Sequence, residues 1–196
     1  MSATLSTAAW VAHDLGTAIG VGGGLFGRIA LEPSVRHIDD REKRGEVVAA
    51  AWRRFGAVQL GSLAVMAATW YAGRSKLNGL AAGGGGASGL VLAKDVLVGT
   101  CLATAVGSAI TGNLMAAQRR KGAVPMNEDG EVDEDAPAPA RALGRLTDAL
   151  GLLNLCAGVG VVAVTAALAM ESGKLQDLDR RQPMAALTPA KTVARS

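Results

Sequence analysis

The chain has 196 residues, of which 49% are apolar, only 3% are aromatic and 26 are glycine, with a formal net charge of +3. This length suits one domain, and the small side chains favour helices that approach closely in a bilayer over a soluble leucine- and phenylalanine-rich core. The basic residues lie in short clusters between apolar blocks, without interleaved aromatics to stack on bases, which argues against a nucleic-acid partner.

Four apolar blocks follow one another along the chain and predict four transmembrane helices. A helix needs about 20 residues to cross the hydrocarbon core, and none of the blocks alternates like a barrel strand. The spans are expected at about residues 8–31, 55–73, 94–117 and 150–170. The predicted fold is all-α, an integral membrane bundle of four transmembrane helices. It forms one domain over residues 1–175, followed by a polar, disordered tail over residues 176–196.

The first block carries no charge before the pair His13-Asp14. A cleaved signal peptide would have a basic start and a shorter apolar region, so a retained helix is favoured. Ionisable groups are costly in lipid and are usually functional there. A span that starts at Leu5 buries the pair as a proton relay, whereas one that starts at Trp10 makes it an interfacial anchor, which we favour.

The stretch "GVGGGLFGR", residues 20–28, fits the G-x-G-x-x-G spacing of a dinucleotide-binding loop. Such a loop needs a strand before it and a helix that opens after it, and this stretch lies late in a continuous apolar block. Glycines four residues apart instead share one helix face and let a neighbouring helix approach closely. The predicted packing residues are Gly16, Gly20, Gly23, Gly24 and Gly27.

The connection between the first two spans is dense in both signs of charge. Asp39/Lys43 and Asp40/Arg44 are acid-before-base pairs at i,i+4 that support an exposed helix. Helix two is therefore expected to extend into the cytoplasm, with Trp52 at the membrane interface. This extension is either a docking stalk or, as we favour, a solvated helical extension.

The other two connections are predicted to be irregular. Four consecutive glycines at 83–86 indicate a flexible loop before span three. The polar insert 119–145 holds an acidic run that lacks the residue order of a calcium loop, so a disordered acidic linker is expected.

Lysine and arginine residues set the expected orientation. The first and third connections hold twelve, and the opposite side holds six. This excess places the first and third connections in the cytoplasm and both termini outside the cell membrane.

A candidate intramembrane polar site combines the ionisable pair with the amides of the later spans; its members are His13, Asp14, Gln59, Asn113 and Asn154. Hydrogen bonding between helices is the default role of the amides. The thiols of Cys101 and Cys156 are expected to pack within spans. No Ser-His-Asp set, metal motif or Walker loop appears, so neither an enzyme nor a cofactor is predicted. Haem ligated by His13 is the alternative, with Met66, Met115 or a second subunit as the other ligand.

The layout of the chain resembles a known family. Four spans, a charged first connection, a long polar insert before span four and "LGLLNLCAGVGVVAV" (150–164) are similar to the transmembrane protein 205-like family. The stretch "AHDLGTAIGVGGGLFG" (12–27) resembles the first span of bacterial relatives, although the low aromatic content departs from the eukaryotic members. The resemblance implies a small four-helix membrane protein without an assigned reaction, and it carries over no catalytic residue.

Three classes of function fit these features. The favoured one is a non-enzymatic scaffold or accessory subunit in the lipid bilayer, which presents its charged segments to a protein partner or a second copy of itself. The second is a small transporter or channel that uses His13-Asp14. The third is a haem-binding electron carrier in the membrane.

Overall fold

The computed structural model describes residues 3–81, 87–118 and 123–186, and their secondary structure is almost entirely helical. The long helices are α1 (Ala3–Phe26), α3 (Arg41–Ala81), α4 (Ala87–Ala117) and α5 (Ala138–Ala186). Three short elements join α1 to α3, namely η1 (Gly27–Leu31), α2 (Glu32–Ser34) and η2 (Val35–His37). Over the described ranges, β-structure is limited to one antiparallel bridge between Met126 and Val132. The predicted all-α class is confirmed.

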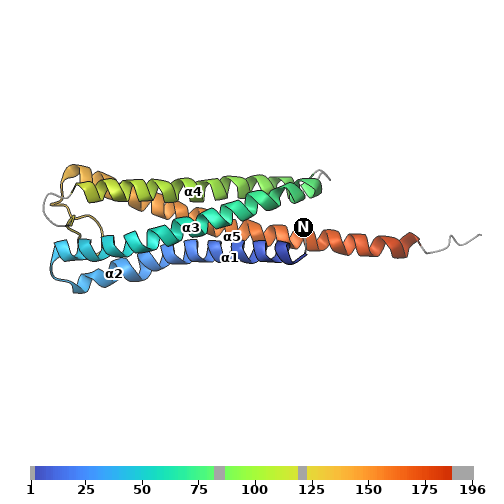
Figure 1. Ribbon diagram of the computed structural model, residues 1–196, viewed down its shortest axis with the longest axis horizontal. Coiled ribbons are helices and arrows are strands. Elements are labelled where there is room, and N and C mark those ends of the chain that lie inside the picture. The colour runs from blue at the N-terminus through green and yellow to red at the C-terminus, as the bar shows by residue number, and fades with distance from the viewer. Residues whose placement is uncertain (1–2, 82–86, 119–122, 187–196) are drawn as a thin grey trace, which may run out of the picture.

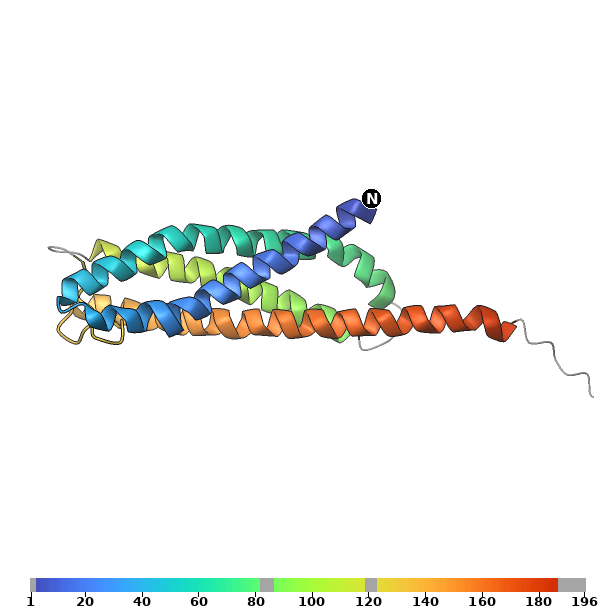
Figure 2. The same ribbon diagram turned by 90° about the horizontal axis from the view of Figure 1, so that it is seen from below.

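The four long helices run side by side along the long axis of the molecule (Figures 1 and 2). They form two pairs, because α1 packs mainly against α3 and α4 packs mainly against α5. The last part of α5 projects beyond the bundle (Figure 2). Because the bundle consists of two helix pairs, the distance between the pairs can differ from one end of the bundle to the other.

Three of these helices are long and apolar enough to cross a membrane, over Arg41–Arg74, Ser88–Ala117 and Ala138–Glu171. Their outward faces carry large apolar side chains that a soluble protein would bury, such as Val58 on α3, Leu92 on α4 and Val162 on α5. The helix α1 is shorter and completes the bundle as its fourth member. Three of the four long helices thus have the length and apolar character of membrane spans.

Helix α3 begins at Arg41, well before the apolar block that starts at Phe55, so helix two has the expected extension. Asp40 caps its start, because its carboxylate accepts hydrogen bonds from the backbone N–H of Glu42 (2.9 Å) and Lys43 (3.2 Å). The predicted Asp40/Arg44 pair is therefore wrong. The Arg44 guanidinium instead donates to the Ile38 carbonyl at 2.6 Å.

The expectation of a disordered acidic linker is wrong for residues 123–145. Residues 123–137 form a packed loop and α5 begins at Ala138, while 119–122 lie outside the described residues. Val124 and Met126 are buried, and the Asn127 side chain accepts hydrogen bonds from two N–H groups of its own turn. Apolar residues within the acidic run thus anchor it.

Two other expected irregular segments are largely helical. Helix α3 continues to Ala81 and α4 starts at Ala87, so only residues 82–86 of the second connection lie outside the described residues. Helix α5 continues to Ala186, so residues 176–186 of the tail that was predicted to be disordered lie in a helix, while 187–196 lie outside the described residues. The sequence 171–182 contains mostly good helix formers, which explains why the helix continues beyond the apolar block that ends at Met170.

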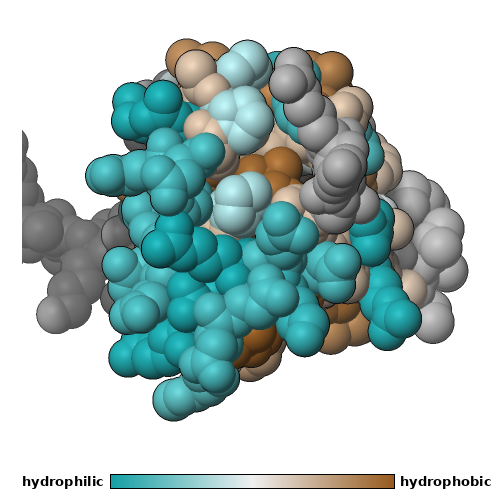
Figure 3. Space-filling model, turned by 90° about the vertical axis from the view of Figure 1, so that its left-hand side faces the viewer, coloured by the Kyte–Doolittle hydropathy of each residue, from teal (hydrophilic) through white to brown (hydrophobic). Residues whose placement is uncertain are grey.

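The first and third connections meet at one end of the bundle, which we call the charged end (residues 32–44 and 123–137). The N–H of Met126 donates to the Arg41 carbonyl, and the Arg41 guanidinium pairs with Asp133 and Asp135 at 3.2 and 3.1 Å. A view onto this end shows mostly hydrophilic side chains (Figure 3). The two connections therefore lie on one side of any membrane that the bundle crosses.

The main core lies away from the charged end, between α3, α4 and α5. Its fully buried side chains include Leu63 and Met66 of α3, Val98 and Cys101 of α4, and Val161 of α5. All of these are medium-sized apolar groups, and they hold the two helix pairs together over this length.

Candidate functional site

The glycines of α1 set how closely it approaches α3. A Cβ added at Gly16 would lie 2.5 Å from the Ser62 carbonyl oxygen, and one at Gly20 would lie 2.7 Å from the Leu63 side chain. Added Cβ atoms at Gly23 and Gly27 would overlap the rings of Phe55 and Trp52. Four of the five predicted packing glycines therefore lie against α3.

The fifth, Gly24, has a different environment. A Cβ at this position would meet only the Gln59 amide nitrogen, at 3.9 Å. Gly24 lies on the wall of a cavity that the four long helices and the loop 123–132 enclose at the charged end.

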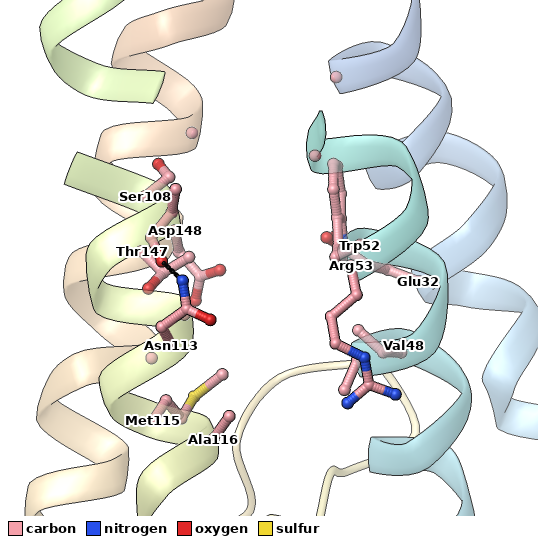
Figure 4. Close-up of a pocket in the computed structure, with 18 of the residues that line it drawn as sticks. Glu32, Val48, Trp52, Arg53, Ser108, Asn113, Met115, Ala116, Thr147 and Asp148 are labelled. Atoms are coloured by element: carbon pink, nitrogen blue, oxygen red, sulfur yellow. Dashed lines mark hydrogen bonds between the residues drawn. The ribbon is translucent and has the colours of Figure 1, made fainter. Parts of the chain in front are cut away.

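This cavity has a volume of about 440 Å³, within the range of small-molecule sites. In the close-up, α4 and α5 form one wall and α1 and α3 form the other, with the loop across the bottom (Figure 4). Much of the lining has little or no side chain, as at Gly24, Gly56, Ala105, Ala109 and Gly112. The cavity exists because the helix pairs diverge here and these residues leave the gap unfilled.

The cavity is open on one side and bridged on the other. Arg53 and Ala57 of α3 and Asn113 of α4 are lining residues that remain exposed, so one opening lies between these two helices; Glu131 and Asp148 are exposed lining residues as well. Between α1 and α5, the Arg28 guanidinium donates to the Asp148 carbonyl at 2.6 Å. A molecule would therefore enter between α3 and α4.

The structure brings the three predicted amides together at this cavity. The Asn154 amide donates to the Cys101 carbonyl (2.7 Å) and the Thr104 hydroxyl (2.8 Å), which joins α5 to α4. Gln59 reaches the Gly20 carbonyl of α1 at 3.5 Å, whereas Asn113 bonds within its own helix. Two of the amides thus link helices, and all three line the cavity.

His13 and Asp14 lie elsewhere, so the predicted five-residue site divides. His13 is 3% exposed and donates from Nδ1 to the Met66 carbonyl at 3.0 Å, whereas Asp14 is exposed. Successive residues of a helix point about 100° apart, which separates the two side chains. The neighbour of His13 is instead Lys94, and both lie near the Trp10 ring.

Lys94 is fully buried, and its ammonium lies 4.3 Å from the ring centroid of Trp70. Neither Lys94 Nζ nor His13 Nε2 has a hydrogen-bond partner among the described residues. The Trp70 indole donates to Asp95 at 2.8 Å, and Asp95 also pairs with Arg74. The sequence does not predict this second polar site, because Lys94 stands at the start of the apolar block 94–117 and its partners lie on other helices.

The charged end of the cavity holds acidic and basic side chains that the sequence analysis did not connect. Arg28 and Glu32 come from the segment after α1, Glu131 from the loop and Asp148 from α5. Burial raises the pKa of Glu32; Arg28 opposes this rise, and Asp148 and Glu131 add to it. About a hundred residues separate the first pair from the other two, so sequence spacing gave no signal of this cluster.

No known protein family, curated protein or solved structure matches the chain in the comparisons made. The resemblance to the transmembrane protein 205-like family therefore stays a prediction, as does haem ligation by His13. The side chains of Cys101 and Cys156 are free thiols, the first buried and the second exposed. Within the described residues, no three His, Cys, Asp or Glu side chains gather to hold a metal ion.

Proposed function

We propose that the protein is a non-enzymatic, multi-pass protein of the cell membrane that binds a small amphiphilic molecule, in the manner of a small transporter or carrier. The observation that carries this proposal is the cavity of about 440 Å³ between the two helix pairs. A membrane-facing opening beside Arg53 and Asn113 would admit the molecule from the lipid near the charged end. The ionisable site of such a transporter would pair His13 with Lys94.

Native mass spectrometry of the full-length protein, released from mild detergent, tests the proposal. Gly24→Leu and Gly112→Leu would place side chains into the cavity, since an added Cβ meets nothing closer than 3.9 Å at either position. Gly22→Leu is the matched control, because Gly22 also has open space around it but does not line the cavity. We expect a bound small molecule on the wild type and the control that both filled variants lose. Identical spectra for all four proteins would contradict the proposal.

A scaffold or accessory subunit is the second candidate function, and the packed charged end favours it. Ion pairs from Arg41 to Asp133 and Asp135 hold the first and third connections in one arrangement that a partner or a second copy could contact. A photo-crosslinker at exposed Asp129 should then give one discrete adduct in native membranes. The absence of an adduct there would remove this candidate.

The proposed orientation has the charged end in the cytoplasm and both termini outside. Lys43→Cys and Asp129→Cys place thiols on exposed residues of the first and third connections. A membrane-impermeant maleimide should label both only after the cells are opened. An N-terminal epitope tag should be reached in intact cells if α1 crosses the membrane. Labelling of both cysteines in intact cells would reverse the orientation.

A further inference from the structure

The charges around the cavity indicate what kind of molecule it binds. Its charged lining residues are three carboxylates and two arginines, namely Glu32, Glu131, Asp148, Arg28 and Arg53. Arg28 already donates to the Asp148 carbonyl. Arg53 is exposed, and its guanidinium points along α3 toward the loop (Figure 4). The charged lining residues, three carboxylates against two arginines, therefore sum to a formal charge of −1.

The three carboxylates are close enough to affect one another. Burial is the main cause of the raised pKa of Glu32; the charge of Arg28 opposes the rise, and the charges of Asp148 and Glu131 add to it. Like charges in a partly buried site destabilise each other, and a positive charge between them relieves this repulsion.

An aromatic and apolar surface adjoins this acidic end. Trp52 lies on the α3 wall, across the cavity from Thr147 and Asp148 (Figure 4). Leu60, Ala105 and Leu155 continue the lining toward the core. Aromatic faces attract cations, and the small apolar residues accept a hydrocarbon body.

We propose that the cavity binds hydrophobic organic cations, with the positive group among Glu32, Glu131 and Asp148 and the apolar body along Trp52. This proposal rests on the proposed binding function and adds the charge of the ligand. It distinguishes a site for lipophilic amines and phosphonium ions from one for anionic or neutral amphiphiles.

Two probes of nearly the same shape and opposite charge test the proposal, tetraphenylphosphonium and tetraphenylborate. Each is titrated into the full-length protein in dodecyl maltoside, and tryptophan fluorescence reports binding. Trp52→Phe identifies the part of the signal that comes from the cavity wall, since Trp10 and Trp70 lie at the lysine site. We expect saturable quenching by the cation at an affinity at least about tenfold above that of the anion, which corresponds to about 1.4 kcal/mol.

Charge variants tie this preference to the named carboxylates. Glu32→Gln with Asp148→Asn should remove the preference for the cation, and Glu131→Gln, at an exposed position, should weaken it without a risk to folding. Glu42→Gln with Glu46→Gln is the control, because both residues are exposed on α3 and do not line the cavity.

The outcomes separate the two proposals. Equal affinities for both probes, lost in Gly24→Leu, would overturn the charge selectivity and leave the binding function intact. Quenching that is the same in the wild type and Gly24→Leu would overturn both. A preference for the cation that survives in all the carboxylate variants would overturn the role of these three residues.

Discussion

At Gly16 the first helix lies against the backbone of α3, whereas at Gly24, about two turns later, the same residue type faces a cavity. The core half of the bundle fills the space between its helix pairs with Leu63, Met66 and Val98. Next to the charged end, the equivalent space between the helix pairs is lined by glycine and alanine residues of the long helices. A glycine therefore marks close packing only where a neighbouring backbone or ring occupies the position of its missing Cβ.

The two regions also differ in the partners of their buried or half-buried cationic side chains. In the core half, the Lys94 ammonium lies beside the rings of Trp70 and Trp10 and has no hydrogen-bond partner among the described residues. At the charged end, Arg28 has a carbonyl partner and acidic neighbours. The core half thus encloses its cation, Lys94, among packed side chains. Beside the charged end, the cavity has space for a cation from outside the protein.

The same substitution at both glycines gives the largest expected difference. Gly16→Leu should lower the free energy of unfolding by about 3 kcal/mol, the upper end of overpacking costs, because the Ser62 carbonyl cannot move without α3. Gly24→Leu should change it by less than about 1 kcal/mol, since the cavity accepts the side chain and leucine favours the helix. Unfolding by dodecyl sulfate in mixed micelles measures both. Equal losses would mean that the two positions do not differ in packing.

Lys94→Met probes the enclosed cation. A buried charge without a hydrogen-bond partner is costly, so an apolar side chain of similar length should raise the free energy of unfolding by about 1–2 kcal/mol. The gain is limited because the Trp70 ring already stabilises the ammonium. Lys94→Ala should instead destabilise the protein, because it leaves a void. A methionine variant less stable than the wild type would show that the ammonium has a stabilising partner in the membrane.

Asn154 and Asn113 line the same cavity but bond differently. Asn154→Ala should cost about 0.6–1.7 kcal/mol of unfolding free energy, since its bonds to Cys101 and Thr104 join two helices in an apolar surrounding. Asn113→Ala should cost less, because its side chain is exposed and bonds within α4. Thermal unfolding of the two variants side by side is the measurement. A larger loss for Asn113 would contradict this assignment.

The smallest expected effect is the pH dependence from Glu32. Burial raises its pKa in the folded protein above its ordinary value of 4.5. Its favourable contribution is therefore complete below about pH 4.5 and is lost as the pH rises through the folded-state value. Melting temperatures from pH 4 to 8 should show the wild type becoming less stable relative to Glu32→Gln as the pH increases. Exposed Glu42→Gln serves as the control, and a constant difference between wild type and Glu32→Gln would contradict the prediction.

Several features of the fold follow from local sequence. Apolar blocks long enough to cross a bilayer predict the long helices, and α3, α4 and α5 meet that criterion. The 4-3-4 spacing of Gly16, Gly20, Gly23 and Gly27 marks one helix face, which lies on α3. Composition alone did not predict the order of the insert, because the buried side chains of Val124 and Met126 anchor an acidic run that was expected to be disordered.

The sequence by itself determined that the apolar blocks are helical and which face of α1 carries glycine, because both depend on residues a few positions apart. Only the tertiary structure decided that Gly24 faces a cavity, that His13 neighbours Lys94 rather than pairing with Asp14, and that Arg28 meets Asp148. The physical reason is distance along the chain. Arg28 and Asp148 are 120 residues apart, and their contact depends on how two helix pairs diverge, which no local pattern of residue types specifies.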